Sequence, residues 1–522
     1  MRRAVHPAAC RAACATFVTL ALAACGGDDS PATPETLATA QQACSQLAGK
    51  TVAGASVTAA TTVAATATTP TYCKVNATIP PQLHLELRLP DQWNSKLYYE
   101  GGGGYNGSIQ PLAGGNLAAL KFGYATVTSD SGHTDGGLSA AFALNDALAT
   151  NLFGSLSVPT VMSSTKEMLV AAYGKQPERS YLEGCSEGGR EGMMAAQRNP
   201  NLFDGIVVRA PAHNWVGFMG HFNRNQKAVA SPGGQLNDNK IKLLSKAVRD
   251  ACDAKDGIVD GIVSNPQACT FDATSLRCAA GADAGDTCLS DAQLAVITSR
   301  TSAASYVGGT YKSAGIPLNG TEDDPAAGWN FWVTGNGNVR NSAHYLFQDT
   351  TVKNYLVRDL ARDSLAYEWE SNLNALYSMA VLNDATDPDL RAFKNSNAKL
   401  IFWHGGDDPS LSARDSLDYY QAAVAATGGQ AAADDFMRYY VAPGVLHCRG
   451  GPGADQSDLL SALDAWVTKG TAPGTLTATR LVNGAVQGTR PLCRYPQYPR
   501  YTGPANDAGA AAQAANYTCT SP

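Results

Sequence analysis

The sequence predicts an α/β fold, in which a mostly parallel sheet is interrupted by a long insertion poor in strands. Three observations lead to this fold class. Apolar runs of strand length recur before residue 213 and again after residue 384. A glycine-flanked serine separates one such run from a helical segment within residues 179–198. Between residues 213 and 384 glycine, asparagine and aromatic residues become frequent, and four cysteines cluster.

The glycine-flanked serine is Ser186, in the stretch Gly184-Cys-Ser-Glu-Gly188. Ser180–Glu183 is a short β-prone run before it, and Arg190–Arg198 consists of strong helix formers, ended by Asn199-Pro200. Strand, G-x-S-x-G and helix form the nucleophile elbow of the α/β-hydrolase fold, where small residues permit a sharp turn that exposes the serine hydroxyl. The alternative is a glycine-rich loop that contains a serine by chance.

A second glycine-rich stretch, residues 101–107, follows the expected strand Leu97–Tyr99. Glycine costs backbone entropy, so a run of glycines needs a structural reason. In α/β-hydrolases a glycine-rich loop after an early strand supplies one oxyanion N–H, and the residue after the nucleophile supplies the other. We therefore expect Gly104 and Glu187 to hold the oxyanion. The alternative is a plain flexible loop.

The acid and the base are expected in loops that follow late strands. A buried strand at residues 398–403 leads into a loop with Asp407 and Asp408. A last strand at residues 436–441 leads into a loop with His447. The order serine, acid, histidine suits the fold, so His447 is the expected base and Asp408 the acid that orients it. Asp407 is the competing acid, and a structural histidine is the alternative for His447.

A different kind of site is expected in residues 252–262, which hold three aspartates and two glycines. Hard oxygen ligands at such spacing suit Ca²⁺, although the terminal glutamate of an EF-hand is missing. The site would be structural and not catalytic, and the alternative is an acidic surface turn. The expected ligands are the carboxylates of Asp253, Asp256 and Asp260 and the carbonyls of Ile258 and Ile262.

Composition and charge bear on the expected partners. The chain has 522 residues, of which 44% are hydrophobic and 16% charged, with a formal net charge of −6. No basic cluster is present, so nucleic acid is not an expected partner. Beyond the N-terminus, no uncharged apolar run approaches the ~18 residues that a membrane-spanning helix needs.

The N-terminal residues resemble a targeting segment. Two arginines precede an apolar stretch at residues 12–24, and Leu22-Ala-Ala-Cys25 resembles a bacterial lipoprotein cleavage box. We expect a signal peptide with lipobox at residues 1–25 and a linker at residues 26–42. A lipid on Cys25 would be the only attachment to a membrane, and an ordinary secretory signal is the alternative. The mature protein is expected in the periplasm, on the outer membrane or secreted.

The cysteine count agrees with export. Of 13 cysteines, two lie in the expected signal and one would carry the lipid, which leaves an even number for disulfides. Sequence alone does not determine connectivity, but proximity favours four pairs: Cys252–Cys269, Cys278–Cys288, Cys44–Cys73 and Cys493–Cys519. Cys185 and Cys448 remain. They adjoin Ser186 and His447, so a catalytic triad would bring them together. A pair of buried free thiols is the alternative to a bridge.

The domain organisation follows from these patterns. The hydrolase core is expected in two parts, residues 43–212 and 385–522. The lid domain with the calcium loop is expected between them, at residues 213–384.

These motifs together resemble the tannase/feruloyl esterase family. The resemblance rests on Cys185-Ser186, Asp408, His447-Cys448 and a calcium loop like residues 253–262, and it runs from about residue 44 to residue 519. It implies the five disulfides paired as above, including the bridge between the two remaining cysteines. It also implies the two oxyanion donors and the preference for Asp408 over Asp407.

The resemblance also implies an activity. We expect a serine esterase that hydrolyses feruloyl, galloyl or terephthalate-monoester type aromatic esters through an acyl-enzyme, without an organic cofactor. Trp332 matches the lid tryptophan that packs on the aromatic ring of the substrate. Family members that hydrolyse terephthalate monoesters hold the free carboxylate with a lid arginine.

Without gaps that arginine position falls on Leu346, and Arg340 lies about two helical turns away. A neutral or phenolic aromatic ester is therefore expected at least as much as a terephthalate monoester. A non-catalytic lipoprotein that binds aromatic ligands is the alternative from another class.

Overall fold

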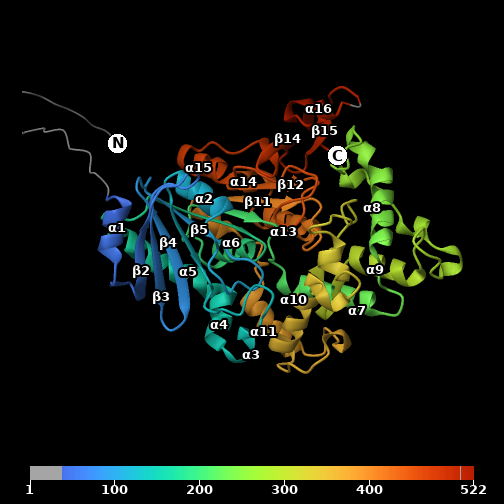
Figure 1. Ribbon diagram of the computed structural model, residues 1–522, viewed down its shortest axis with the longest axis horizontal. Coiled ribbons are helices and arrows are strands. Elements are labelled where there is room, and N and C mark those ends of the chain that lie inside the picture. The colour runs from blue at the N-terminus through green and yellow to red at the C-terminus, as the bar shows by residue number, and fades with distance from the viewer. Residues whose placement is uncertain (1–37, 506) are drawn as a thin grey trace, which may run out of the picture. The chain divides into compact units, whose positions relative to one another are not determined.

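The computed structural model describes residues 38–505 and 507–522. A ten-stranded sheet forms its centre, in the order β1-β2-β3-β4-β6-β5-β7-β8-β11-β12 (Figure 1). The strands of the antiparallel part are β1 (Thr51–Val52), β2 (Ala55–Val63), β3 (Tyr72–Ile79) and β4 (Leu83–Pro90). The parallel strands are β6 (Ala125–Ser129), β5 (Lys96–Glu100), β7 (Arg179–Cys185), β8 (Gly205–Arg209), β11 (Lys399–Gly405) and β12 (Met437–Ala442).

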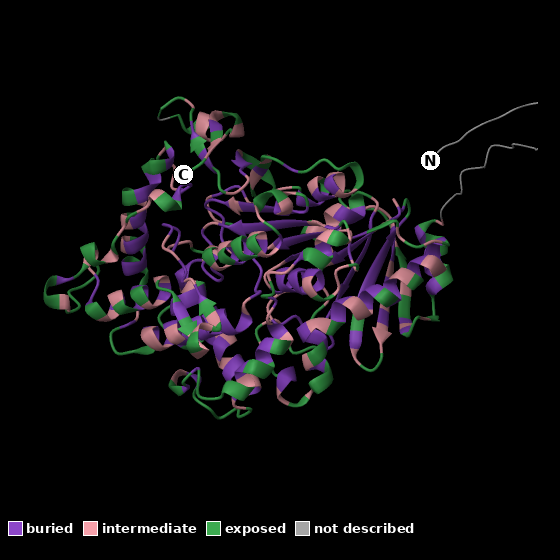
Figure 2. Cartoon of the chain, turned by 180° about the vertical axis from the view of Figure 1, so that it is seen from behind, coloured by how far each residue is buried: buried purple, intermediate pink, exposed green. Residues whose placement is uncertain are grey.

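The parallel strands are buried on both faces because side chains alternate between two apolar layers. On β11, Leu400 and Phe402 join one layer, whereas Ile401 and Trp403 join the other. The first layer packs on α1 (Ala40–Leu47), α5 (Ser157–Tyr173), α6 (Glu187–Arg198) and α13 (Ala413–Ala426). The second packs on α2 (Gly114–Lys121) and α15 (Leu459–Lys469). Figure 2 shows the central strands mostly in the colour of buried residues.

Helix α1 corrects one predicted boundary. It begins at Ala40, inside residues 26–42, which the sequence analysis assigned to a linker. A capping box explains the start: Thr39 Oγ1 accepts from Gln42 N at 3.3 Å, and Thr39 N donates to Gln42 Oε1 at 2.8 Å. The predicted signal peptide and lipobox lie outside the described residues.

Between β8 and β11 the chain is mainly helical, and the only strands of this segment in the described residues are the hairpin β9 (Ala304–Tyr306) and β10 (Tyr311–Ser313). Helix α7 packs against α9 and α10, and Figure 1 shows these helices gathered beside the sheet. The longer helices of the segment are α7 (Trp215–Ala230), α8 (Asp238–Cys252), α9 (Asp291–Thr301), α10 (Ala343–Thr351) and α11 (Leu373–Asn383). The shorter helices of the described chain are α3 (Phe142–Asn145), α4 (Ala147–Asn151), α12 (Arg391–Asn395), α14 (Gln430–Asp434) and α16 (Ala508–Ala511).

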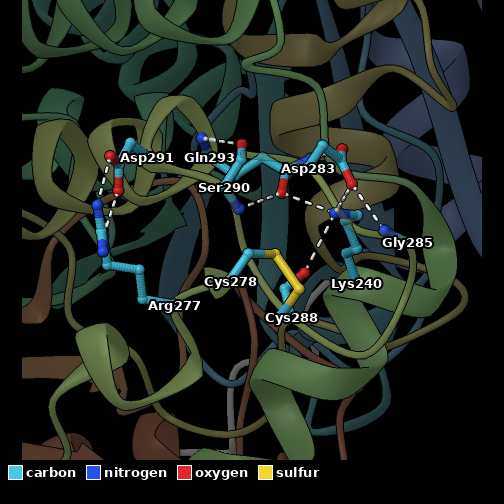
Figure 3. The surroundings of a disulfide bond; sticks show 9 residues. All are labelled: Lys240, Arg277, Cys278, Asp283, Gly285, Cys288, Ser290, Asp291 and Gln293. Atoms are coloured by element: carbon cyan, nitrogen blue, oxygen red, sulfur yellow. Dashed lines mark hydrogen bonds and ion pairs between the residues drawn. A yellow bond between two sulfur atoms is a disulfide. The ribbon is translucent and has the colours of Figure 1, made fainter. Parts of the chain in front are cut away.

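One corner of the insertion is organised around a buried lysine (Figure 3). Lys240 Nζ donates to Asp283 Oδ1 at 2.9 Å, to Gln293 Oε1 at 2.9 Å and to the carbonyl of Cys288 at 3.1 Å. The Cys278–Cys288 disulfide closes the loop that carries Asp283 and Cys288. The buried ammonium therefore has three acceptors, which offsets its desolvation.

The sequence prediction of disulfides is confirmed, with all five expected pairs. They are Cys44–Cys73, Cys185–Cys448, Cys252–Cys269, Cys278–Cys288 and Cys493–Cys519. The last pair lies in a C-terminal region built from β13 (Leu476–Val482), β14 (Ala485–Leu492), β15 (Tyr498–Tyr501) and β16 (Tyr517–Thr520). Such disulfide content is typical of proteins outside the reducing cytoplasm. In residues 38–505 and 507–522, no helix combines the length and apolarity needed to cross a membrane.

Candidate active site

Ser186 lies at the turn between β7 and α6, with φ 60° and ψ −116°. A non-glycine residue seldom adopts this conformation, and its neighbours make the turn possible. A Cβ on Gly184 would lie 2.4 Å from the carbonyl carbon of Gly188, and a Cβ on Gly188 would lie 2.8 Å from that of Gly101. The flanking glycines are thus sterically required, and the half-buried serine stands at the end of the strand.

The two expected oxyanion donors lie on segments that touch. The N–H of Gly188 donates to the carbonyl of Gly102 at 3.0 Å, which ties the glycine-rich loop to the start of α6. Gly104 has φ 62°, and a Cβ there would lie 2.1 Å from the carbonyl oxygen of Gly137. Within the described part of the chain, the N–H groups of Gly104 and Glu187 donate no hydrogen bond. Both donors are therefore available to a ligand.

Glu191 holds the same loop, and the sequence analysis did not identify it. Its Oε2 accepts from Gly102 N at 2.9 Å, and its Oε1 accepts from Asn106 Nδ2 at 3.0 Å and from Ser131 Oγ at 3.3 Å. The residue is only 4% exposed. The signal in the sequence would be a glutamate one turn into the helix that follows Ser186. Its role could not be inferred from that position, because its partners lie about 60 to 90 residues away in the chain.

The Glu187 side chain pairs with Arg190, one turn further along α6. It is fully buried, and its Oε2 accepts from Arg190 Nε at 2.7 Å in a two-pronged ion pair. Arg190 also donates to the carbonyls of Gly154 and Phe153, each at 2.7 Å. This network anchors the first turn of α6, which carries the Glu187 N–H.

His447 and Asp408 come together from the loops after β12 and β11. His447 Nδ1 lies 2.7 Å from Asp408 Oδ2, and Asp408 Oδ1 accepts from the N–H groups of Ser410 at 2.7 Å and Leu411 at 3.0 Å. Burial by itself would raise the pKa of Asp408, but His447 and His404 outweigh burial and hold this pKa below its ordinary value. The carboxylate is therefore ionised and oriented toward the histidine.

Asp407, the competing acid, faces elsewhere. Its Oδ1 accepts from the N–H of Gly444 at 3.0 Å, and it forms no hydrogen bond or ion pair with His447 in residues 38–505 and 507–522. Burial raises the pKa of Asp407 to about 7. Of the two aspartates, Asp408 alone has the geometry of a partner for the base.

The Cys185–Cys448 disulfide links the segments that carry Ser186 and His447. The α-carbons of these cysteines lie 5.9 Å apart. Because they immediately precede Ser186 and follow His447, the serine and the histidine belong to linked segments. The structure thus places the Ser186 turn and the His447–Asp408 pair on linked segments at the carboxyl ends of the parallel strands.

Trp332 lies beside this assembly. Its ring stands edge-on to that of His447, with centroids 5.3 Å apart, and lies 5.6 Å from the ring of His344. It sits in the helical turn Asn330–Thr334 and is 8% exposed. Trp332 is thus placed to contact a substrate that reaches the base, and this contact stays a prediction.

Leu346 occupies the position expected for a carboxylate-binding arginine, and Arg340 is the arginine nearby in the sequence. Leu346 lies on α10 and is half-buried. Arg340 is 52% exposed at its side chain, contacts the hydroxyl of Tyr345 and lies 3.6 Å from Asp363 Oδ1. Its guanidinium is therefore engaged with partners of the insertion itself.

The predicted calcium residues lie in one loop, after α8. Asp253 Oδ2 accepts from Gly261 N at 2.8 Å, and Asp256 Oδ2 accepts from Ser264 N at 2.9 Å. Asp260 forms an ion pair with Arg490 of β14. Among the residues that the structure describes, no three histidine, cysteine or acidic side chains form a group that could hold a metal ion.

The chemistry of the loop nevertheless suits a hard cation. The N–H groups of Ile258 and Ile262 donate to Asp256 Oδ1 at 3.3 Å and Asp260 Oδ1 at 3.2 Å, so the backbone wraps around the carboxylates. Asp253 and Asp256 are 3% and 1% exposed, yet neither has an ion pair within the described ranges. Burial is the main cause that raises the pKa of Asp256, to about 6. Burial of two carboxylates without a cationic partner is costly, and a bound metal cation would offset this cost. The loop should therefore be tested for Ca²⁺ binding.

The structure has two sizeable cavities, the second of which is lined by Asp407, the neighbour of Asp408. One, of about 700 Å³, lies between the predicted calcium loop and β14. The other, of about 520 Å³, lies between α9, β12 and residues 263–274. Neither is lined by Ser186, Asp408 or His447.

The fold and the serine turn define the class of protein. A largely parallel sheet, with a serine at a strand–helix turn and an acid–histidine pair after two later strands, is the architecture of the α/β-hydrolases. The predicted fold class is therefore confirmed.

Comparison with known proteins gives the family. The sequence model described as "Tannase and feruloyl esterase" matches residues 65–520. The chain is 32% identical to mono(2-hydroxyethyl) terephthalate hydrolase of Piscinibacter sakaiensis, over 87% of this chain and 86% of that protein. It is 31% identical to a probable feruloyl esterase of Arthroderma benhamiae, over 84% of each. The chain belongs to the tannase and feruloyl esterase family, as its motifs indicated, and is a carboxylic ester hydrolase.

A solved structure agrees at the level of the fold. The crystal structure of an esterase from Aspergillus oryzae superposes with a TM-score of 0.81 and covers 92% of this chain and 100% of its own. The sequence identity is 23%, so the likeness concerns the fold alone.

Proposed function

We propose that the protein is a serine esterase that hydrolyses aromatic carboxylic esters through an acyl-enzyme. The observation that carries this proposal is the 2.7 Å contact of His447 Nδ1 with the ionised Asp408. The Cys185–Cys448 disulfide joins the loop of His447 to the residue before Ser186. The available N–H groups of Gly104 and Glu187 supply the second requirement, donors for a developing oxyanion.

The proposed reaction has two halves. Ser186 Oγ attacks the ester carbonyl carbon while His447 Nε2 takes the hydroxyl proton, and the carbonyl oxygen becomes an oxyanion bound by Gly104 N–H and Glu187 N–H. The bond to the leaving oxygen then breaks, and His447 returns the proton to the departing alcohol. Water then attacks the acyl carbon while His447 takes its proton, the bond from that carbon to Ser186 Oγ breaks, and His447 returns the proton to Ser186 Oγ as the acid leaves. Asp408 stabilises the imidazolium in both halves.

The substrate class follows from two considerations. Trp332 beside His447 offers an aromatic surface to the acyl group. Family relatives bear names that refer to feruloyl esters and to mono(2-hydroxyethyl) terephthalate. Leu346 on α10 and the engaged Arg340 provide no free cation for a terephthalate carboxylate, so we favour neutral or phenolic aromatic esters.

The experiment is turnover of methyl ferulate, methyl gallate and mono(2-hydroxyethyl) terephthalate by purified protein, with Ser186→Ala as control. We expect hydrolysis of the ferulate or gallate ester and none by the variant. A preference for mono(2-hydroxyethyl) terephthalate would instead favour terephthalate monoesters as the substrate class. No turnover, with aromatic ligands still bound, would contradict the esterase proposal and favour a binding protein.

We further infer export with a lipid anchor at Cys25, supported by the lipobox-like residues 22–25. The test is incorporation of labelled palmitate in a bacterial host, which Cys25→Ser should abolish. Secretion of unlabelled wild-type protein would indicate an ordinary signal peptide instead.

Calcium is a separate proposal. Asp253, Asp256 and Asp260, with the carbonyls of Ile258 and Ile262, would hold the ion. A bound ion would stabilise the loop and supply no chemistry at Ser186.

A further inference from the structure

A second histidine contacts the proposed catalytic acid. His404 is the penultimate residue of β11 and is fully buried. Its Nε2 lies 3.2 Å from Asp408 Oδ2, the same oxygen that accepts from His447. Its other ring nitrogen, Nδ1, lies 2.8 Å from Ser416 Oγ of α13. The carboxylate oxygen is therefore shared by two imidazoles.

The proton positions follow from the partners. An ionised carboxylate only accepts hydrogen bonds, so His404 Nε2 carries the proton that faces Asp408. With a single ring proton on Nε2, Nδ1 accepts from the hydroxyl of Ser416. The same Nε2–H donates to the carbonyl of Leu411 at 3.3 Å, and Asp408 Oδ2 is its ion-pair partner at 3.2 Å. The acceptors at Nε2 thus select the tautomer, and the Ser416 hydroxyl satisfies Nδ1.

With His404 included, the Asp408 carboxylate has polar neighbours on both oxygens. Oδ1 accepts from the N–H groups of Ser410 and Leu411, and Oδ2 contacts the imidazoles of His447 at 2.7 Å and His404 at 3.2 Å. A carboxylate offers about four acceptor positions, so each has a polar group beside it. The residue is only 2% exposed, so water does not compete for these positions. Its rotamer is fixed by contacts on both oxygens.

We propose that His404 is a positioning residue, whose Nε2–H holds the Asp408 carboxylate in the orientation that presents Oδ2 to His447. This inference rests on the proposed esterase mechanism. His404 acts through Asp408 and forms no bond to the reacting atoms. Its loss should leave Oδ2 with one donor and let the acid turn, which misaligns the base.

A matched pair of variants separates this role from a merely structural one. The amide of glutamine reaches the position of Nε2, whereas that of asparagine reaches only the position of Nδ1. In His404→Asn we expect kcat to fall by roughly 10- to 100-fold with KM within twofold, because alignment is lost and substrate contacts are not. In His404→Gln we expect kcat to stay within about threefold of wild type. This change is far smaller than the fall in kcat that a misaligned base would cause.

Ser416→Ala tests the support of the His404 ring and protects the experiment against a misfolded Asn variant. It removes the hydrogen-bond partner of the buried Nδ1, so the ring is held less firmly and we expect a fall in kcat of severalfold with unchanged KM. Unchanged kcat in both Ser416→Ala and a folded His404→Asn would overturn the proposal. If His404→Asn does not fold, an unchanged kcat in Ser416→Ala alone would overturn the proposal, and a severalfold fall would support it.

A spectroscopic readout is independent of turnover. The His447 Nδ1 proton, bonded to an ionised carboxylate, should give a far-downfield proton NMR signal. We expect the signal to shift in His404→Asn and Ser416→Ala and to persist in His404→Gln. Absence of hydrolysis by wild type with this pattern intact would reject the esterase function but retain the positioning role. An unaltered signal in every variant would reject the positioning role.

Discussion

The disulfide between Cys185 and Cys448 joins the residue before Ser186 to the residue after His447. Their α-carbons lie 5.9 Å apart although 263 positions separate them in the sequence. A rigid link at this place holds the proposed nucleophile and base together from both sides of the insertion. The remaining four disulfides span at most 29 positions and close local loops.

Removal of this bridge should cost both stability and rate. For Cys185→Ala/Cys448→Ala we expect a clear fall in Tm, because loop-closure entropy allows on the order of 5 kcal/mol for so long a loop. We also expect lower kcat, since the base loop loses its attachment to the elbow. The matched control is Cys278→Ala/Cys288→Ala, for which the same model allows only about 3 kcal/mol. Equal kcat in both double variants would contradict the alignment role.

Glu191→Gln should impair catalysis without changing substrate affinity. The glutamine amide has one oxygen that accepts hydrogen bonds and one nitrogen that does not. The loop of Gly102 and Asn106 therefore loses part of its attachment to α6. We expect kcat to fall by roughly 10- to 100-fold and KM to change little, because a donor at Gly104 is displaced. Glu167→Gln, at an exposed position of α5, is the control. A change confined to KM would argue against a role in the oxyanion site.

Asp407 and Asp408 should respond oppositely to substitution. Asp408→Asn should lower kcat by about 10⁴, because the amide orients the wrong tautomer of His447. Asp407→Asn should retain activity, since the amide still accepts from Gly444 N. Steady-state kinetics of the two variants decide the assignment, and a reversed order would make Asp407 the acid.

Asp407 should also shape the pH dependence of stability. Its pKa in the folded protein is about 7, whereas an unfolded aspartate has about 3.9. The folded state therefore holds a proton that the unfolded state has released, so stability falls as pH rises from about 4 to about 7. Asp407→Asn removes this contribution, and thermal melts from pH 4.5 to 8 should show a flatter profile than wild type. Parallel profiles would show that the aspartate is not protonated in the fold.

Calcium should stabilise the protein without entering the reaction. Chelation with EDTA is expected to lower Tm, and Ca²⁺ to restore it, because Asp253 and Asp256 are buried without a cationic partner in the described ranges. Asp256→Asn should abolish the response. The kcat measured below the melting range should stay unchanged. A Tm indifferent to EDTA and Ca²⁺ would show that backbone N–H groups and Arg490 suffice for the loop.

Trp332→Ala should change selectivity more than the chemical step. Loss of the ring beside His447 is expected to raise KM for methyl ferulate by about tenfold, in line with an aromatic contact of about 1 to 1.5 kcal/mol. A small aliphatic ester lacks this contact, and its kcat/KM should change little. Equal losses for both esters would show that the tryptophan supports His447 and does not bind substrate.

Local sequence patterns determined several features of this protein. The serine turn could be predicted because Gly184 is required by its close contact with Gly188, within a few residues of Ser186. Gly188 is required by the distant Gly101, a contact that only the fold creates. The strand at residues 398–403 could be predicted because a parallel strand buried on both faces needs a continuous apolar run. The disulfides closed by near neighbours could be paired because the chain between them is short.

The tertiary structure alone decided which side chains meet around the acid and the oxyanion loop. Asp407 and Asp408 are adjacent, and only the path of the loop after β11 turns one toward His447. Glu191 gains its partners from segments 60 to 89 residues away in the chain. His404 meets Asp408, Leu411 and Ser416 because the chain after β11 folds back on the end of this strand. A residue's neighbours along the chain set its backbone conformation. Its contacts across the sheet depend on strand order, helix packing and burial, which no local pattern encodes.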